Sequence, residues 1–244
     1  MQIPKKVHYC WFGKNPLPAM AVKCIESWKK YLPDYEIIEW NEDNFDVNII
    51  PYTQEAYEAK KYAFVSDFAR FWILYRHGGL YFDTDVEVIK PMDKILSQGA
   101  FMGCEQDYDS PNGVTVAPGL GLAAPIGMPI YKELENFYGK LHFLNADGTL
   151  NQVTIVEYTT NCLQKHGLCD IEGIQMVADL RIYPSRYFCP ISVVDGKLRI
   201  TSDTYSIHHY AQSWQSPARK YGRKLALLLG GEKIKNVLKK LLYS

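Results

Sequence analysis

The stretch from residue 62 to residue 88 constrains the fold more than any other part of the sequence. Residues 62–77 place apolar side chains on nearly every side of a helix, so we expect this helix to be buried. Gly78 and Gly79 end it. Residues 80–88 then alternate with a period of two, which predicts one continuous strand. A buried helix followed directly by a strand is typical of the interior of an α/β fold.

The first 40 residues favour the same class. Residues 7–12 and 36–40 are short and apolar and predict strands, and residues 18–31 between them show helical spacing. This strand–helix–strand order favours an α/β fold with a partly parallel sheet. Further along we expect a strand at residues 100–103 and a loop at 105–127. Two helices should follow at 128–143 and 151–165, and short strands and turns at 174–210.

The amino-acid composition excludes some classes of protein. Of the 244 residues, 47% are hydrophobic and 22% are charged, which excludes a disordered chain. The net charge is zero, which argues against a nucleic-acid partner. The six cysteines form no C-x-x-C pair, so we expect free thiols in a reducing cytosol. With no secretory leader and no apolar run of about 20 residues, we expect a cytoplasmic protein or one attached to the inner face of the plasma membrane.

The charge is unevenly distributed. Residues 216–244 hold eight Lys or Arg residues and one acid, so they carry +7 and residues 1–215 carry −7. We therefore expect a single catalytic domain at 1–215 and a basic helical tail at 216–244. The tail is amphipathic, which favours peripheral contact with an anionic membrane. The alternative is a helix that packs on the domain or on a partner subunit.

Asp83 and Asp85 form a D-x-D pair. On a continuous strand both side chains would project from the same face, ~6–7 Å apart. Two carboxylates this close repel each other unless a cation lies between them, and hard oxygen ligands suit Mg²⁺ or Mn²⁺. The alternative is the polar outer face of a half-exposed strand. The position after a buried helix favours the metal, because unpaired buried carboxylates are costly.

Asp67 and Arg70 are three residues apart on the buried helix and therefore share a face. They form either a structural ion pair or a site in which Arg70 meets an anionic or hydroxyl-rich ligand while Asp67 accepts hydrogen bonds from hydroxyls. The residues alone leave both alternatives open.

Three motifs together resemble one enzyme family. The run FVSDFARFWILYRHGGLYFDTDVEV contains the pattern S-D-x-x-R…G-G-x-Y-x-D-x-D. It resembles the D-x-D-containing sugar transferases of the Och1-like and capsular-polysaccharide type, which share this pattern with the catalytic domain of large clostridial glucosylating toxins. The opening IPKKVHYCWFG and the closing HHYAQSW are similar to the first and last motifs of the family. The resemblance therefore extends from residue 3 to residue 214.

The resemblance implies a GT-A fold, a Rossmann-like α/β sandwich that binds a nucleotide sugar. It implies a metal-dependent, retaining glycosyltransferase with Mn²⁺ or Mg²⁺ as cofactor and a UDP-sugar as the favoured donor. The implied acceptor is a glycan or lipid-linked glycan in bacterial capsular or surface polysaccharide synthesis.

The resemblance also implies roles for residues around the D-x-D pair. Asp85 would bind the metal directly, and Asp83 would contact the ribose or donor sugar and reach the metal through water. Tyr81 would touch the phosphate or sugar, while Asp67 and Arg70 would hold the hydroxyls of the donor sugar.

The two ends of the chain supply the remaining implied residues. Trp11 would stack on the base of the nucleotide. His208 would bind the metal or the diphosphate, with His209 as the alternative, and Ser213 and Trp214 would close over the diphosphate. We also expect acceptor contacts from the loop at 105–127, through Asn112, Gly113 and Gly119–Gly121, although no motif supports this.

Two other functions compete with sugar transfer. D-x-D pairs also occur in metal-dependent phosphohydrolases, but here no such motif ends the first strand. A non-catalytic nucleotide-sugar-binding module is the second alternative, and the intact Asp67, Arg70, Asp83 and Asp85 argue against it. A toxin-like protein glycosylator is a variant of the leading hypothesis.

Overall fold

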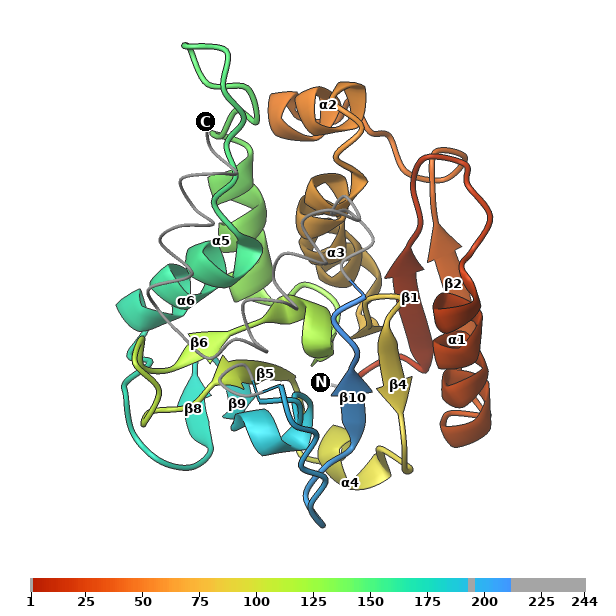
Figure 1. Cartoon of the computed structure of the whole chain (residues 1–244), viewed down its shortest axis with the longest axis vertical. Helices are drawn as coiled ribbons and strands as arrows, with labels where there is room; N and C mark the ends of the chain where they lie inside the picture. The colour runs from red at the N-terminus through yellow and green to blue at the C-terminus, as the bar shows by residue number, and fades with distance from the viewer. Residues whose placement is uncertain (1, 193–195, 212–244) are drawn as a thin grey trace.

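The computed structural model describes residues 2–192 and 196–211 as a mixed sheet flanked by helices (Figure 1). The sheet has the strand order β2-β1-β3-β7-β5-β9-β8, with β6 paired to β5. These strands are β1 (Lys6–Cys10), β2 (Glu36–Trp40), β3 (Gly79–Tyr81), β5 (Phe101–Gln106), β6 (Thr115–Val116), β7 (Leu122–Ala124), β8 (Gln175–Val177) and β9 (Leu180–Tyr183). The helices are α1 (Ala19–Tyr31), α2 (Pro51–Glu58), α3 (Tyr62–His77), α4 (Asp93–Leu96), α5 (Pro129–Tyr138) and α6 (Ile155–Lys165), with short 3₁₀ turns η1 (Pro118–Leu120) and η2 (Ser185–Tyr187).

The sheet runs mostly in one direction. β1 is parallel to β2 and β3, and β5 is parallel to β9. β7 lies between β3 and β5 and is antiparallel to both. The prediction of an α/β fold with a partly parallel sheet is confirmed. Because β1 and β3 are parallel, their carboxyl ends meet at one edge of the sheet, where ligands bind in folds of this kind.

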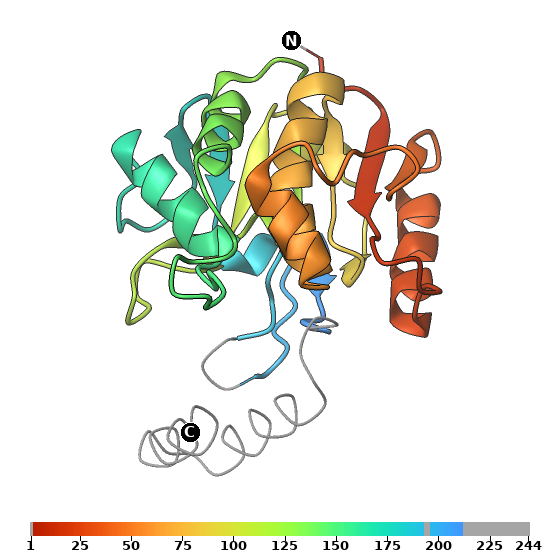
Figure 2. The same cartoon turned by 90° about the horizontal axis from the view of Figure 1, so that it is seen from above.

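Two apolar clusters cover the two faces of the sheet. One contains the buried residues of α2, α3, α5 and α6, and the other contains those of α1 and α4. Helices α3 and α5 lie side by side (Figure 2). On β3, Leu80 joins the second cluster and Tyr81 joins the first, and both are at most 1% exposed. A strand covered on both faces needs bulky side chains on both, which is why β3 has no polar face.

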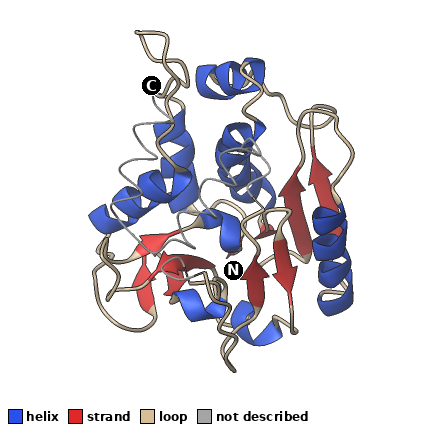
Figure 3. Cartoon of the chain, in the orientation of Figure 1, coloured by secondary structure: helices blue, strands red, loops and turns tan. Residues whose placement is uncertain are grey.

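The predicted strand at 80–88 is wrong in its continuity. β3 ends at Tyr81, and β4 (Val86–Val88) pairs with β10 (Ser206–His208) in a separate two-stranded sheet (Figure 3). Between them the chain turns, and the Val86 N–H donates to the Asp83 carbonyl at 3.0 Å. The alternation misled because Phe82, which follows β3, is buried in the same apolar cluster as Val86 and Val88 of β4.

The predicted loop at 105–127 is also partly wrong. It contains β6, η1 and β7, and β7 is an interior strand of the sheet. These elements are two or three residues long, so no periodicity marks them. The sequence assigned no element to α2. The bounds expected for α3 and β2 agree with the structure, and the helices expected at 128–143 and 151–165 are present but shorter, as α5 and α6.

Within the described part of the chain, no helix combines the length and apolar character needed to cross a membrane. The tail expected at 216–244 lies outside the described residues.

Candidate functional site

Arg70 is the centre of a buried polar cluster. Its side chain is 3% exposed, and Nη2 lies 3.0 Å from Asp67 Oδ1 and 3.2 Å from Asp83 Oδ1. Arg70 Nε donates to the Ser66 carbonyl one helical turn back, at 3.1 Å. The helix α3 therefore fixes the guanidinium, which joins the S-D-x-x-R part of the sequence to the D-x-D turn.

Tyr81 completes this cluster. The Arg70 guanidinium lies over the Tyr81 ring, 4.8 Å from the ring centroid. The Tyr81 hydroxyl donates to Asp83 Oδ1 at 3.2 Å. Burial raises the pKa of Tyr81 well above its usual value, so it stays a neutral donor. Burial also raises the pKa of Asp67 to about 7, with Arg70 opposing the shift. The Arg70 guanidinium therefore lies between two carboxyl groups and the ring of a neutral tyrosine.

Gly119 in η1 lies directly on this cluster. The Asp83 N–H donates to the Gly119 carbonyl at 3.2 Å. A Cβ atom at Gly119 would overlap the Asp83 carboxylate and come within 3.3 Å of Arg70 Nη1. The sequence placed Gly119 in an acceptor loop, whereas the structure places it against Asp83. Gly113, which was expected in the same acceptor loop, lies instead beside Asp170.

Asp85 and His208 form the second half of the site. His208 Nε2 lies 3.0 Å from Asp85 Oδ1, and each side chain is 14% exposed. The antiparallel pairing of β10 with β4 places His208 opposite Val86, next to Asp85. The Ala211 and His209 N–H groups donate to the Asp85 side chain and main chain at 2.7 and 2.9 Å. β10 and the residues directly after it thus hold Asp85 through both its side chain and its main chain.

Asp85 and His208 each stabilise the charged form of the other. Burial opposes the charged form of Asp85, yet the interaction with His208 and the hydrogen bond from Ala211 give it a lowered pKa. Burial likewise opposes a charged His208, but Asp85 gives it a raised pKa. Asp85 is therefore an ionised carboxylate, as a metal ligand must be.

Asp83, Asp85 and His208 fit a divalent cation. One ligand atom of each lies within 4.8 Å of the others. Among the described residues, His208 Nδ1 is buried and has no hydrogen-bond partner. Carboxylate and imidazole donors in this combination are compatible with Mn²⁺ or Mg²⁺. The structure thus brings the three predicted metal ligands together, by a turn and a returning strand rather than on one strand face.

His209 points elsewhere. Its Nε2 lies 2.7 Å from Glu87 Oε2, and Lys23 Nζ contacts the same carboxylate at 2.8 Å. Between the two adjacent histidines, the geometry favours His208 as the ligand next to the D-x-D turn.

Trp11 directly follows β1, at the same edge of the sheet as the D-x-D turn. Its N–H donates to the Trp40 carbonyl at 2.8 Å, and its indole Nε1 donates to the Asn15 carbonyl at 2.6 Å. The ring is only partly buried, so it is accessible to a ligand. The predicted site residues Ser213 and Trp214 lie outside the described residues.

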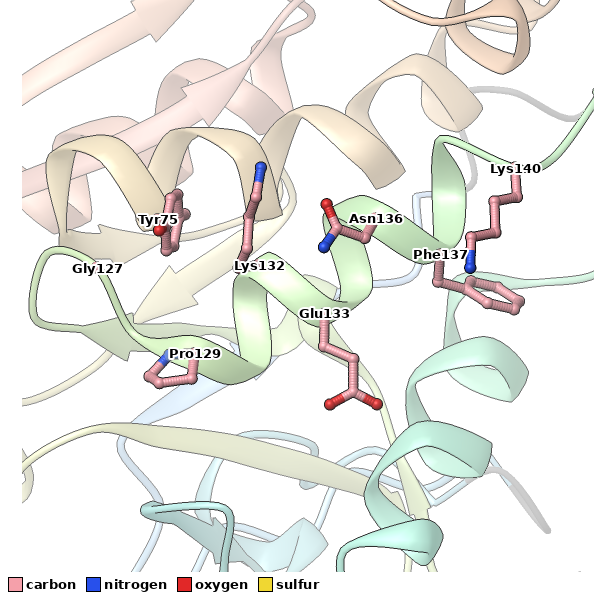
Figure 4. Close-up of a pocket in the computed structure, with 8 residues that line it drawn as sticks. All are labelled: Tyr75, Gly127, Pro129, Lys132, Glu133, Asn136, Phe137 and Lys140. Carbon is pink, nitrogen blue, oxygen red and sulfur yellow. The ribbon is translucent and has the colours of Figure 1, made fainter.

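A surface groove of about 620 Å³ lies along α5, lined by Tyr75, Lys132, Asn136, Phe137 and Lys140 among others (Figure 4). Asp67, Arg70, Asp83, Asp85 and His208 are all absent from its lining. Because the carboxylates, the arginine and the histidine that can do chemistry meet elsewhere, we place the candidate active site at the D-x-D turn.

Comparison with known proteins agrees with the resemblance. Residues 18–102 match the family described as "Glycosyltransferase sugar-binding region containing DXD motif". Inositol phosphoceramide mannosyltransferase 3 of Schizosaccharomyces pombe is 28% identical over 146 residues, which are 58% of this chain and 40% of that protein. The chain thus spans less than half the length of this relative. An uncharacterized glycosyltransferase of Acanthamoeba polyphaga mimivirus is 26% identical over 87% of this chain and 84% of its own length.

The fold is similar to that of a solved structure. It is a glycosyltransferase involved in the glycosylation of the major capsid of PBCV-1, with a TM-score of 0.50, 13% identity, and coverage of 89% of this chain and 97% of its own. The predicted GT-A fold and the predicted family resemblance are confirmed.

Proposed function

We propose that this chain, which carries the sugar-binding region of the DXD glycosyltransferases, transfers a sugar from a nucleotide-sugar donor to a glycan acceptor. In this reaction the anomeric carbon leaves the diphosphate oxygen and bonds to an acceptor hydroxyl oxygen, which loses its proton. One observation carries the proposal: the Arg70 cluster and the Asp85–His208 pair meet at the D-x-D turn.

Asp83, Asp85 and His208 are the proposed ligands of a divalent cation. When bound, Mn²⁺ or Mg²⁺ would neutralise the negative charge that develops on the departing diphosphate. Asp85 supplies an ionised oxygen that is already held in place by the Ala211 N–H. His208 supplies a buried ring whose Nδ1 has no partner within residues 2–192 and 196–211.

Arg70 and its two carboxylates are the proposed sugar-binding group. Asp67 and the Ser66 carbonyl hold the guanidinium, so its orientation does not depend on the ligand. Asp67 and Asp83 can accept hydrogen bonds from sugar hydroxyls, and their negative charge would stabilise an oxocarbenium-like transition state. Tyr81 orients Asp83, and Trp11 is the proposed platform for the base.

The finer identity of the reaction is also proposed. The fission yeast relative is named a mannosyltransferase, which makes a mannosyl donor the first to test beside the UDP-sugars favoured by the resemblance. Retention of configuration, a lipid-linked or capsular acceptor, a cytoplasmic location and membrane contact through residues 216–244 are further parts of this proposal.

The test is hydrolysis of a panel of UDP- and GDP-sugars, because glycosyltransferases slowly hydrolyse their donor without an acceptor. Wild type is compared with Asp85→Asn and with Asp43→Asn, which changes an exposed carboxylate outside the site. We expect hydrolysis of one donor that is lost with a chelator and in Asp85→Asn but kept in Asp43→Asn. Metal-dependent binding of a nucleotide sugar without hydrolysis or transfer would favour the binding module, and absence of both would contradict sugar transfer.

A further inference from the structure

A second group of metal-ligating side chains lies between α5 and α6. Glu133 projects from α5, and Cys162 and His166 project from α6. Cys162 and His166 are four residues apart, so they share one face of their helix. One ligand atom from each of the three residues lies within 4.8 Å of the others.

Hydrogen bonds already bring these three side chains together. The Cys162 thiol donates to Glu133 Oε1 at 3.5 Å, and His166 Nε2 lies 2.8 Å from Glu133 Oε2. Each contact occupies an atom that would otherwise bind a metal. A cation at this point would replace hydrogen-bond protons, and the three side chains would need little rearrangement.

Packing holds the two helices in register. The Tyr158 ring of α6 contacts Phe137 and Tyr138 of α5, with centroids 5.1 and 5.6 Å apart. Leu163, next to Cys162, is fully buried. The backbones that carry the three ligands are therefore fixed by the core, which is what a preorganised site requires.

The local charges leave Glu133 available. Lys132, its neighbour in sequence, pairs with Glu135 at 3.0 Å, and Arg76 pairs with the same Glu135. Figure 4 shows Lys132 and Glu133 projecting from opposite faces of α5. In the described part of the chain, the Glu133 carboxylate contacts His166 Nε2 and forms no ion pair with a lysine or arginine. The side chains of Glu133 and His166 are 47% and 37% exposed, so an ion can reach them from solvent.

We propose that Glu133, Cys162 and His166 form a zinc site that joins α5 to α6. Sulfur, imidazole nitrogen and carboxylate oxygen are the three ligand types that Zn²⁺ takes in proteins, and three of them leave a fourth position for water. On binding, the Cys162 thiol loses its proton to solvent. His166 binds through Nε2 and carries its proton on Nδ1. The site shares no ligand with the D-x-D turn, and its metal takes no part in the proposed sugar transfer.

The expected consequence of zinc is structural. Thr160 of α6 accepts a hydrogen bond from the Val116 N–H at 2.9 Å, just before the η1 turn that carries Gly119 to Asp83. A cation that ties α6 to α5 therefore stabilises α6, and α6 in turn holds the segment at Val116 that leads into η1 and the D-x-D turn. We expect zinc to change the melting temperature rather than to be required for the chemistry.

Cobalt titration of the metal-stripped, tag-free full chain tests the ligands directly. Co²⁺ bound to a thiolate gives a charge-transfer band in the near ultraviolet, and Zn²⁺ should abolish this band by displacement. We expect the band in wild type and its loss in Cys162→Ser. The matched control is Cys169→Ser, which removes an exposed thiol outside the cluster. Asp85→Asn should also keep the band, which separates this site from the D-x-D turn.

Thermal unfolding supplies the second readout. Zn²⁺ should raise the melting temperature of wild type, and His166→Gln should weaken zinc binding by more than ~10-fold. His142→Gln is the control, because His142 also contacts a glutamate, Glu55, at 2.7 Å but has no cysteine beside it. Absence of the cobalt band in wild type, its persistence in Cys162→Ser, or an equal zinc shift in His166→Gln would overturn the proposal.

Discussion

His208 Nε2 lies 3.0 Å from Asp85 Oδ1, although the two residues come from distant parts of the sequence. The pairing of β10 with β4 creates this contact. The D-x-D motif is therefore one half of the candidate metal site, and the returning strand supplies the other half. This arrangement gives the first prediction.

His208→Ala should weaken metal-dependent activity. Loss of a metal ligand should reduce the affinity for Mn²⁺ at least as much as loss of a residue that orients a ligand, which typically costs about 10–100-fold. The measurement is the Mn²⁺ concentration that gives half-maximal donor hydrolysis. His209→Ala is the matched control, since its side chain contacts Glu87 instead. Equal effects of the two substitutions would remove His208 from the site.

Arg70→Met should destabilise the fold as well as abolish activity. It would leave the Asp67 and Asp83 side chains without the guanidinium that both contact, and breaking a buried ion pair by removing one partner costs about 3–5 kcal/mol. Urea unfolding measures this free energy. Arg186→Met is the control, because the Arg186–Asp203 pair is about half exposed and such pairs contribute at most about 1 kcal/mol. Similar costs at the two positions would show that the cluster is not a buried ion-pair network.

Gly119→Ala should impair the site because the new methyl group would overlap the Asp83 carboxylate. We expect a destabilisation of about 1–3 kcal/mol, typical of overpacking, together with a clear loss of donor hydrolysis. Gly139→Ala is the control: its backbone φ is −60°, and the nearest atoms to an added Cβ are 3.6 Å away. Unchanged activity in Gly119→Ala would mean that η1 can move away from Asp83 without consequence.

His8 should make the protein sensitive to acid. Its ring is fully buried, with Nε2 2.9 Å from the Gly78 carbonyl oxygen and Nδ1 accepting from the Trp40 indole at 3.0 Å. Burial lowers the pKa of His8 to about 4. Protonation of His8 favours the unfolded state, because the pKa of the ring is lower in the folded state. The contribution of neutral His8 to the free energy of unfolding is therefore complete above pH ~6.5. This free energy falls by about 3 kcal/mol in total as the pH drops toward ~4.

The measurement for His8 is the free energy of unfolding at several pH values from about 7.5 down to about 4.5. His8→Gln should show a shallower loss of stability over this window than wild type, and His142→Gln, an exposed histidine, should behave like wild type. The same pH dependence in His8→Gln and wild type would show that His8 is not a source of acid sensitivity.

The sequence predicted those features that depend on local periodicity. The bounds of α3 and β2 follow from their patterns, and the Asp67–Arg70 pair follows from helical spacing. The break between β3 and β4 could not be predicted from the alternating pattern, because side chains before and after the break are buried in the same apolar cluster.

Contacts between residues far apart in the sequence could not be predicted from local patterns. The contact of His208 with Asp85 depends on which strand β10 pairs with, and the position of Gly119 depends on the insertion of β7 between β3 and β5. The motif resemblance pointed to His208 without giving its partner. No signal in the sequence pointed to Glu133, Cys162 and His166 as a group, since the alignment of α5 with α6 brings them together.

The most direct test of the central claim is Mn²⁺ binding followed by electron paramagnetic resonance, in the presence of UDP or GDP. We expect wild type and Asp43→Asn to bind Mn²⁺ together with one of these nucleotides, and Asp85→Asn not to bind it. Equal Mn²⁺ binding by wild type and Asp85→Asn would contradict a metal site at the D-x-D turn.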